Sequence, residues 1–420
     1  MTALLFITFL ILLAIGVPIA FAVAMAGVAV LVVGDVKLLI VVQRMFAATD
    51  SFPLVAVPFF ILAGDLLARG VMSQKLVAFA ESILGRIRGG LSAVSVVAGM
   101  FFAAISGSGA ATTAAVGATL IPELKKRGYD ESSSAALVAA AGCIGVVIPP
   151  SVPMVLYAVI ADQSVTRLFT NGFLPGVLMG GILIAISLRQ AYKRNYPKGA
   201  EFSWRSVWIT FRQSIWGILM PVIILGGIFS GYFTPSEAAA VAVIYAAIVS
   251  LFIYRDMSLK EIAQIILGSA KTSAVVMLII ACSGVFGWVL ANWKIPEQVA
   301  QGVLSISSDK YVVLFLIAII ILIAGVFMET SSAVILLTPV FLPLMKALDI
   351  NLVHFGIIFT IGISIGMITP PVAINLFVAS SITGLQIEKI AKSVIPYLLG
   401  LIFIFLLYVY LPLFLPALII

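Results

Sequence analysis

The segment 145–151 reads Gly-Val-Val-Ile-Pro-Pro-Ser, and the segment 366–372, which lies 221 positions later, reads Gly-Met-Ile-Thr-Pro-Pro-Val. Proline lacks a backbone N–H and clashes with the preceding turn, so each Pro-Pro pair predicts an interrupted helix. Four prolines of the first copy align with prolines of the second without a gap: 122 with 343, 149 with 370, 150 with 371 and 175 with 396. Chance alignment of apolar segments would match leucines and isoleucines but not four prolines, so the sequence predicts an internal repeat.

The composition around this repeat is that of a membrane protein. Of 420 residues, 63% are hydrophobic and 10% are charged, whereas about a quarter of the residues of soluble domains are charged. At roughly 20 residues per helix, the apolar runs supply around ten membrane crossings. The net charge of +7 is therefore interpreted as a topology signal and not as a nucleic-acid surface.

Several chemistries are not expected of this chain. The two cysteines, Cys143 and Cys282, lie inside apolar runs, so neither a disulfide framework nor a transition-metal cluster is indicated. A Walker A motif, which would predict ATP hydrolysis, does not occur in the sequence. A serine hydrolase using Ser108 would need an oriented base, but the one histidine, His354, lies outside the expected membrane midplane. We therefore expect no enzyme.

Two pairs of apolar runs are too short to be comfortable crossings. The runs 91–105 and 110–121 flank a polar tip at 106–109, and the runs 311–327 and 332–345 flank a second tip at 329–332. Short apolar arms around a polar turn are typical of re-entrant hairpins. We expect these hairpins at about 91–125 and 311–346.

The distribution of basic residues predicts the topology. With a cytoplasmic N-terminus and two re-entrant hairpins, most of the 24 Lys and Arg residues fall in cytoplasmic loops, as the positive-inside rule requires. This arrangement predicts nine crossings, and the odd number between the two copies inverts the second one. We expect a first inverted repeat at 1–195, a cytoplasmic amphipathic helix with a connecting helix at 196–233, and a second repeat at 234–420. Inverted repeats with broken helices are typical of secondary transporters.

Candidate ion ligands follow from the breaks and the tips. Carbonyls left unpaired at a broken helix are hard oxygen ligands suited to a small cation such as Na⁺. Hydroxyls can add to them: Ser106 and Ser108 at the first tip, and Thr330 and Ser331 at the second. We predict two pseudo-symmetric Na⁺ sites. Proton coupling through Glu329 stays open as an alternative.

An anionic substrate is expected at the same place. Hairpin and half-helix N-termini favour negative charge, and small polar residues such as Ser151 and Asn375 lie beside the breaks. Arginine does not occur within an apolar run as a substrate clamp.

With these motifs identified, the whole chain resembles the large membrane subunit of the tripartite ATP-independent periplasmic (TRAP) transporters, within the ion-transporter superfamily. The resemblance rests on five segments: Ser-Gly-Ser-Gly-Ala-Ala-Thr-Thr-Ala-Ala at 106–115, Leu-Ile-Pro-Glu-Leu-Lys-Lys-Arg-Gly-Tyr at 120–129, Ile-Pro-Pro-Ser-Val-Pro-Met at 148–154, Gly-Tyr-Phe-Thr-Pro-Ser-Glu-Ala-Ala-Ala at 231–240 and Thr-Pro-Pro-Val-Ala-Ile-Asn at 369–375.

The resemblance implies site residues and partners. It implies a first Na⁺ site at Ser106, Ser108, Gly145, Ile148 and Pro150, and a second at Thr330, Ser331, Gly366 and Thr369. Gly109 stands where many relatives carry a hydroxyl, beside the substrate. Na⁺ would be the coupling ion and no cofactor is implied.

The resemblance also implies a physiological setting. It implies an elevator-type importer of an organic acid, a C4-dicarboxylate or a sialic acid, in the bacterial inner membrane. Its partners would be a small four-helix membrane subunit, expected to be a separate polypeptide, and a periplasmic substrate-binding protein. A stand-alone anion carrier or Na⁺/H⁺ exchanger without a binding protein is the alternative.

Overall fold

The computed structural model describes residues 1–198, 202–307, 309–415 and 418–419, and this part of the chain is helical. The helices of the first half are α1 (Thr2–Ala14), α2 (Ile19–Val33), α3 (Leu39–Thr49), α4 (Ala56–Arg69), α5 (Met72–Leu84), α6 (Gly90–Ser106), α7 (Gly109–Lys126), α8 (Glu131–Cys143), α9 (Val152–Ala161) and α10 (Val165–Lys193). Those of the second half are α11 (Trp204–Phe229), α12 (Pro235–Ile248), α13 (Leu259–Asn292), α14 (Ile295–Ile306), α15 (Lys310–Phe327), α16 (Thr330–Ala347), α17 (Leu352–Gly366), α18 (Ile374–Thr383) and α19 (Ile387–Phe414).

Helix bounds recur at the spacing of the sequence repeat. Helices α7 and α16 are both 18 residues long, and α9 and α18 are both ten residues long. Each pair begins 221 or 222 residues apart, and both Pro-Pro bonds, 149–150 and 370–371, are cis. The inversion of the two copies across a membrane stays a prediction.

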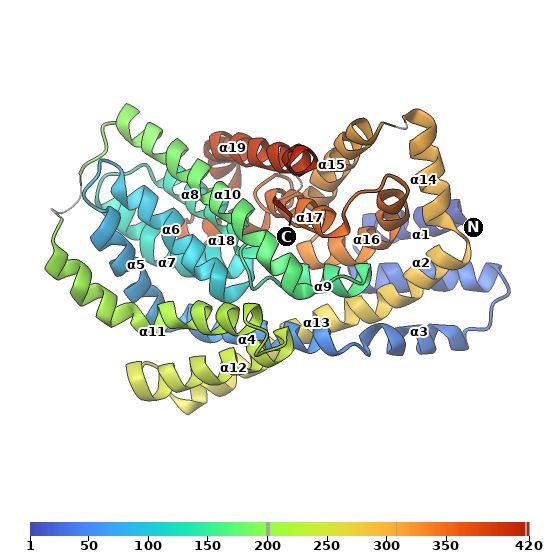
Figure 1. Cartoon of the computed structure of the whole chain (residues 1–420), viewed down its shortest axis with the longest axis horizontal. Coiled ribbons are helices and arrows are strands. Elements are labelled where there is room, and N and C mark those ends of the chain that lie inside the picture. Colours follow the sequence, from blue (N-terminus) through green and yellow to red (C-terminus); the bar gives the residue numbers. More distant parts are fainter. Residues whose placement is uncertain (199–201, 308, 416–417, 420) are drawn as a thin grey trace.

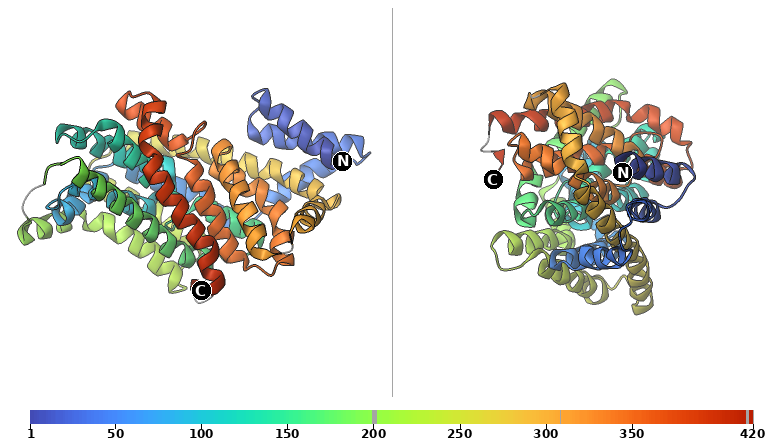
Figure 2. Two further views of the ribbon diagram at one scale, coloured as in Figure 1. Left: turned by 90° about the horizontal axis from the view of Figure 1, so that it is seen from above. Right: turned by 90° about the vertical axis from the view of Figure 1, so that its right-hand side faces the viewer.

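The apolar run 3–33, which without a charged residue predicts one first membrane helix, is not a single helix in the structure. It forms two helices, α1 and α2, which pack against each other and project at one end of the molecule (Figure 2). Gly16 has a φ of +85°, which only glycine adopts freely, and Pro18 caps α2. A further helix, α3, follows α2, and it packs along α13 with Arg44 over the Trp288 ring at 5.7 Å.

The segment 196–233 also differs from the prediction. The expected amphipathic helix at 201–216 is not separate from the connecting helix, because α11 runs unbroken from Trp204 to Phe229. The Ser203 side chain caps the first turn of α11 by accepting the Ser206 N–H. The exposed Trp204 and Trp208 lie near that end of the helix. One continuous helix therefore carries both the polar and the apolar stretch.

Two groups of helices position the site. Helices α3, α4, α11, α12 and α13 run along one long side of the molecule, and α6–α10 and α15–α19 lie beside them (Figure 1). We call the first group the long-side helices and the second the hairpin core. Eight stretches of the described chain are long and apolar enough to cross a membrane: 52–69, 165–193, 204–229, 235–254, 259–292, 310–327, 330–347 and 387–414. The chain is thus a multi-pass membrane protein, whereas the two re-entrant hairpins stay a prediction.

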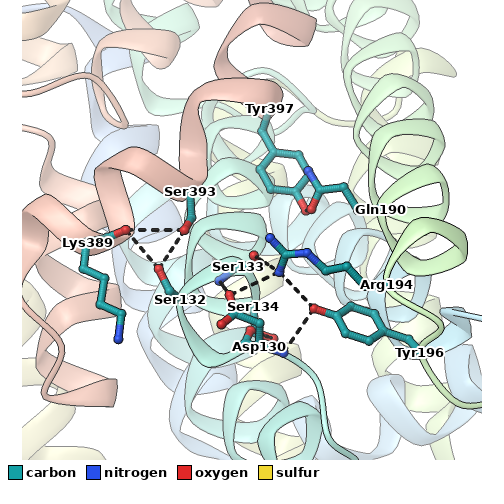
Figure 3. A network of polar contacts seen from close by, with 10 residues as sticks. All are labelled: Asp130, Ser132, Ser133, Ser134, Gln190, Arg194, Tyr196, Lys389, Ser393 and Tyr397. Atoms are coloured by element: carbon teal, nitrogen blue, oxygen red, sulfur yellow. Dashed lines mark hydrogen bonds and ion pairs between the residues drawn. The ribbon is translucent and has the colours of Figure 1, made fainter.

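A polar network joins the two halves of the hairpin core (Figure 3). At the start of α8, Ser132 Oγ lies 2.7 Å from Ser393 Oγ of α19 and donates to the Lys389 carbonyl at 2.9 Å. Beside it, Arg194, which follows α10, donates to Ser133 Oγ at 2.8 Å and pairs with Asp130 at 3.4 Å. Residues far apart in the sequence are therefore held together at this end of the core.

Candidate functional site

Both hairpin tips and both broken helices border one cavity of about 210 Å³. The core contributes residues of the two tips and of the helix starts beyond the breaks, and the long-side helices contribute the opposite wall: Ile61, Gly64 and Asp65 of α4, and Thr272 and Val276 of α13. Among the described residues that line this central cavity, Asp65 and Glu329 are acidic and none is Lys, Arg or His. The described lining of this cavity is therefore acidic.

The first tip is a tight turn between α6 and α7. Gly107 has a φ of +59°, a left-handed conformation that glycine adopts without strain. Ser108 caps α7 by accepting the Ala111 N–H at 3.4 Å, and Ser106 Oγ lies 3.0 Å from Thr112 Oγ1. Two of these hydroxyl residues were predicted ligands, whereas buried Thr112 was not singled out from the sequence.

The first broken helix packs directly on this tip. An added Cβ at Gly145 would lie 2.7 Å from both the Ser108 carbonyl oxygen and Thr112 Oγ1, and one at Gly107 would lie 2.7 Å from the Pro150 carbonyl oxygen. Four predicted ligands, Ser106, Ser108, Gly145 and Pro150, are thus brought together. The fifth, Ile148, lies in the same break with its side chain against Gly176 of α10. The carbonyls of Ile148 and Pro150 accept no hydrogen bond from the described residues.

The second tip contributes hydroxyls to the same cavity. Thr330 and Ser331 both line it. Glu329 caps α16 by accepting the Ser332 N–H at 3.1 Å, and it also accepts the Ser331 hydroxyl at 3.1 Å. Thr330 Oγ1 is buried and has no hydrogen-bond partner in the described part of the chain. An unsatisfied buried hydroxyl is costly, so Thr330 Oγ1 is the strongest candidate ligand atom at this tip.

The second break is placed differently from the prediction. Gly366 packs against Gly325 of α15, and its carbonyl accepts the Thr369 N–H at 3.0 Å. Thr369 Oγ1 donates back to the Ile365 carbonyl at 2.9 Å. Neither Gly366 nor Thr369 lines the central cavity. The residues near this break that line it are Met367 and Ile374.

Of the predicted substrate residues, only Gly109 lines the central cavity. Ser151 is fully buried, caps α9 through the Met154 N–H at 3.3 Å and donates to the Val146 carbonyl. Asn375 is also fully buried and donates to the Ala139 carbonyl at 3.1 Å, while its Oδ1 finds no partner among the described residues. These two side chains hold helix ends in place and do not face the cavity.

The long-side wall was missed by the sequence reasoning. Asp65 Oδ2 accepts the Ser269 hydroxyl of α13 at 2.6 Å, and Thr272 lies one turn further along α13. The repeat gave no signal for these residues, because position 286, the counterpart of Asp65, is Phe. Their position in the site follows only from how α4 and α13 pack on the tips.

Two helical hairpins and two broken helices surround one cavity whose lining includes hydroxyl and carboxyl side chains. In a chain with many membrane-length helices, this arrangement is that of a membrane transport protein. A family profile described as "Tripartite ATP-independent periplasmic transporter, DctM component" matches residues 6–414. The chain belongs to this family of transporter permeases and is not an enzyme.

Individual relatives agree with the family. The chain is 41% identical over 369 residues to a C4-dicarboxylate TRAP transporter large permease protein of Pseudomonas aeruginosa, covering 88% of this chain and 86% of that one. It is 40% identical over 410 residues to an isethionate TRAP transporter permease protein of Oleidesulfovibrio alaskensis, covering 96% of this chain but 64% of that longer protein. The crystal structure of the YdaH transporter of Alcanivorax borkumensis aligns with a TM-score of 0.64 at 16% identity, covering 90% of this chain and 88% of that one. That likeness concerns the fold alone.

Proposed function

We propose that this chain is the permease through which a tripartite system imports an organic acid, driven by Na⁺ and by an elevator movement. The substrate would be of the C4-dicarboxylate or sialic acid class, delivered by a periplasmic binding protein. The chain would work with a small four-helix membrane subunit in the bacterial inner membrane, with its N-terminus in the cytoplasm. Relatives named for C4-dicarboxylate, isethionate and 2,3-diketo-L-gulonate support an organic anion as the substrate class.

The observation that carries Na⁺ coupling is the charge of the central cavity. Asp65 and Glu329 line it without a basic partner, so an organic anion entering alone would meet repulsion in a medium of reduced dielectric constant. Cations bound first would reverse this. The first site would use the Ser106 and Ser108 hydroxyls with carbonyls of Gly145, Ile148 and Pro150, and the second would use Thr330 and Ser331, with Gly366 and Thr369 reaching it only after rearrangement.

The arrangement of helices supports the elevator movement. The hairpin core holds both tips and both breaks, and the network around Arg194 and Ser132 ties its two halves together (Figure 3). The wall formed by α4 and α13 contributes side chains of another group of helices. We infer that the core moves as one body along this wall and carries the cavity contents with it.

The test is uptake of labelled organic acids into proteoliposomes that contain the chain with its small subunit. Uptake should require both an inward Na⁺ gradient and the binding protein. Uptake that ignores the binding protein would favour a stand-alone carrier. Uptake driven by a pH gradient alone would contradict Na⁺ coupling and would direct attention to Glu329.

A further inference from the structure

A second cavity adjoins the central cavity beside the first hairpin tip. It has a volume of about 350 Å³ and lies between α7 on one side and α4 with the start of α5 on the other. The two cavities share Asp65 and Ala111 as lining residues. We call the second cavity the α4–α7 groove.

The groove leads from the first tip toward the basic end of α7. Its wall on α7 runs from Ala111 to Thr119, which corresponds to about 12 Å along a helix. Helix α7 continues to Lys125 and Lys126, the end that the positive-inside rule assigns to the cytoplasm. The groove therefore extends from the central cavity toward the predicted cytoplasmic side.

The cavities at the equivalent place in the second half of the chain are separate from the central cavity. Between α13 and α16, which occupy the equivalent positions of the second half, lie cavities of about 280 and 400 Å³ that share Gly287 and Pro339. Neither of these shares a lining residue with the central cavity in the part of the chain that the structure describes. In this conformation the α4–α7 groove is thus the one that adjoins the tips.

One basic residue lines the groove. Arg69 is exposed at the end of α4 and forms no ion pair or hydrogen bond with the described residues. Asp65, one turn earlier, accepts the Ser269 hydroxyl instead, and Asp256 accepts the Val71 N–H at the same helix junction. The guanidinium is left available, and it can bind a carboxylate through two parallel hydrogen bonds.

We propose that Arg69 is an anion-binding residue of the α4–α7 groove and receives the carboxylate of the transported acid between the central cavity and the cytoplasm. The direction follows from charge, because Asp65 and Glu329 repel an anion in the cavity once the accompanying cations leave, and Arg69 attracts it. This role rests on the proposed function, whereas the anion-binding property of the groove does not.

A cysteine reporter tests the groove without any transport measurement. Ala118 is exposed in the groove, whereas the native Cys143 and Cys282 are buried. The Ala118→Cys variant, purified with its small subunit, is treated at low salt with a small anionic reagent, sulfonatoethyl methanethiosulfonate, and with its cationic trimethylammonioethyl counterpart. Each rate is divided by the rate of the same reagent with a free small thiol, because the anionic thiolate by itself favours the cationic reagent. We expect this normalised rate to be higher for the anionic reagent by about fivefold, as for unit charges roughly 8 Å apart in water.

The preference for the anionic reagent should depend on Arg69. Adding Arg69→Gln should abolish this preference or reverse it, because Asp65 also lines the groove, and Arg69→Lys should keep part of it. Arg205→Gln is the matched control, because it removes an exposed charge outside the groove and should leave the preference unchanged. Equal normalised rates with Arg69 present would overturn the proposal.

A lipid phosphate is the other anion that Arg69 can meet. A preference seen in detergent but absent in phospholipid vesicles would mean that lipid phosphate occupies Arg69, and it would overturn the proposal. A preference seen in both would support it. In the same vesicles, Arg69→Gln should lower the maximal uptake rate more than the apparent substrate affinity. Absence of uptake in every variant would contradict the proposed function while leaving the reagent result valid.

Discussion

At the scale of single residues, Thr330 combines burial, cavity position and an unused hydroxyl. Because its Oγ1 lacks a partner, Thr330→Val should not destabilise the protein in Na⁺-free buffer and should stabilise it by about 1 kcal/mol. If Thr330 binds Na⁺, the same variant should lose at least tenfold in apparent Na⁺ affinity for uptake. Thermal unfolding with and without Na⁺, together with Na⁺-dependent uptake, measures both effects.

Thr338 provides a matched control on the same helix. Its Oγ1 is also buried without a partner in the described part of the chain, but Thr338 does not line the central cavity. Thr338→Val should therefore show the same stabilisation with unchanged Na⁺ affinity. Equal Na⁺ affinity in both variants would remove Thr330 from the site.

At the scale of elements, α4 touches the first hairpin tip through Gly64. A Cβ at this position would lie 2.9 Å from Ser106 Cα and 3.2 Å from the Ser106 carbonyl oxygen, which are backbone atoms that cannot rotate away. Gly64→Ala should therefore displace the tip and destabilise the protein by roughly 1–3 kcal/mol. Uptake should fall with it, as measured in proteoliposomes at saturating Na⁺.

The comparison variant for Gly64 is Gly181→Ala in α10. An added Cβ there meets no atom within 4 Å, so the better helix propensity of alanine should stabilise by up to about 1 kcal/mol. A loss of uptake in both variants would show that helix substitution in general, and not the contact with Ser106, is responsible.

The network at the end of the core has a predictable pH dependence. Burial alone would raise the pKa of Asp130, but hydrogen bonds from Ser133 and the charge of Arg194 outweigh it and lower this pKa. The ionised Asp130 carboxylate therefore stabilises the folded state at neutral pH. This contribution is lost as the pH falls below about 4, where Asp130 of the unfolded chain already binds a proton. Because the pair is half exposed, we expect Asp130→Asn to cost about 1 kcal/mol or less at pH 7. Unfolding midpoints of the variant and the native protein should converge toward pH 3; a constant difference would exclude this linkage.

Local signals predicted several elements because they act within a few residues. Thr234, Pro235 and Glu237 have the sequence pattern of a helix start, and the structure has a complete capping box there. The arms of both expected hairpins begin and end within a few residues of the predicted bounds. The break at Gly16 was missed because apolar residues continue on both sides of it, although Gly and Pro two residues apart were a visible signal.

At the scale of the molecule, what the sequence could not predict is which distant helices meet. The tips and breaks were recognisable from polar residues and prolines, and four of the five residues predicted for the first site lie together at the first tip and break. Asp65 and Thr272 join the cavity only because α4 and α13 pack together beside the tips. Ser151 and Asn375 were predicted substrate residues, but in the structure their side chains form hydrogen bonds with backbone groups of Met154 and Ala139. Polar side chains in membrane helices serve both purposes, and spacing alone does not separate them.

The inverted relation of the two halves is the prediction that concerns the whole molecule. Lys126 ends α7 and Ala347 ends α16, 221 positions later, and both are exposed. If the halves are inverted, cysteines at these two equivalent positions must lie on opposite faces of the membrane. In intact spheroplasts, a membrane-impermeant maleimide should label Ala347→Cys directly and Lys126→Cys only after permeabilisation. The buried native Cys143 and Cys282 should stay unlabelled in both. Labelling of both variants from one side would mean that the halves are parallel. Direct labelling of Lys126→Cys in intact spheroplasts would also contradict the cytoplasmic assignment of the α4–α7 groove, which rests on the basic end of α7.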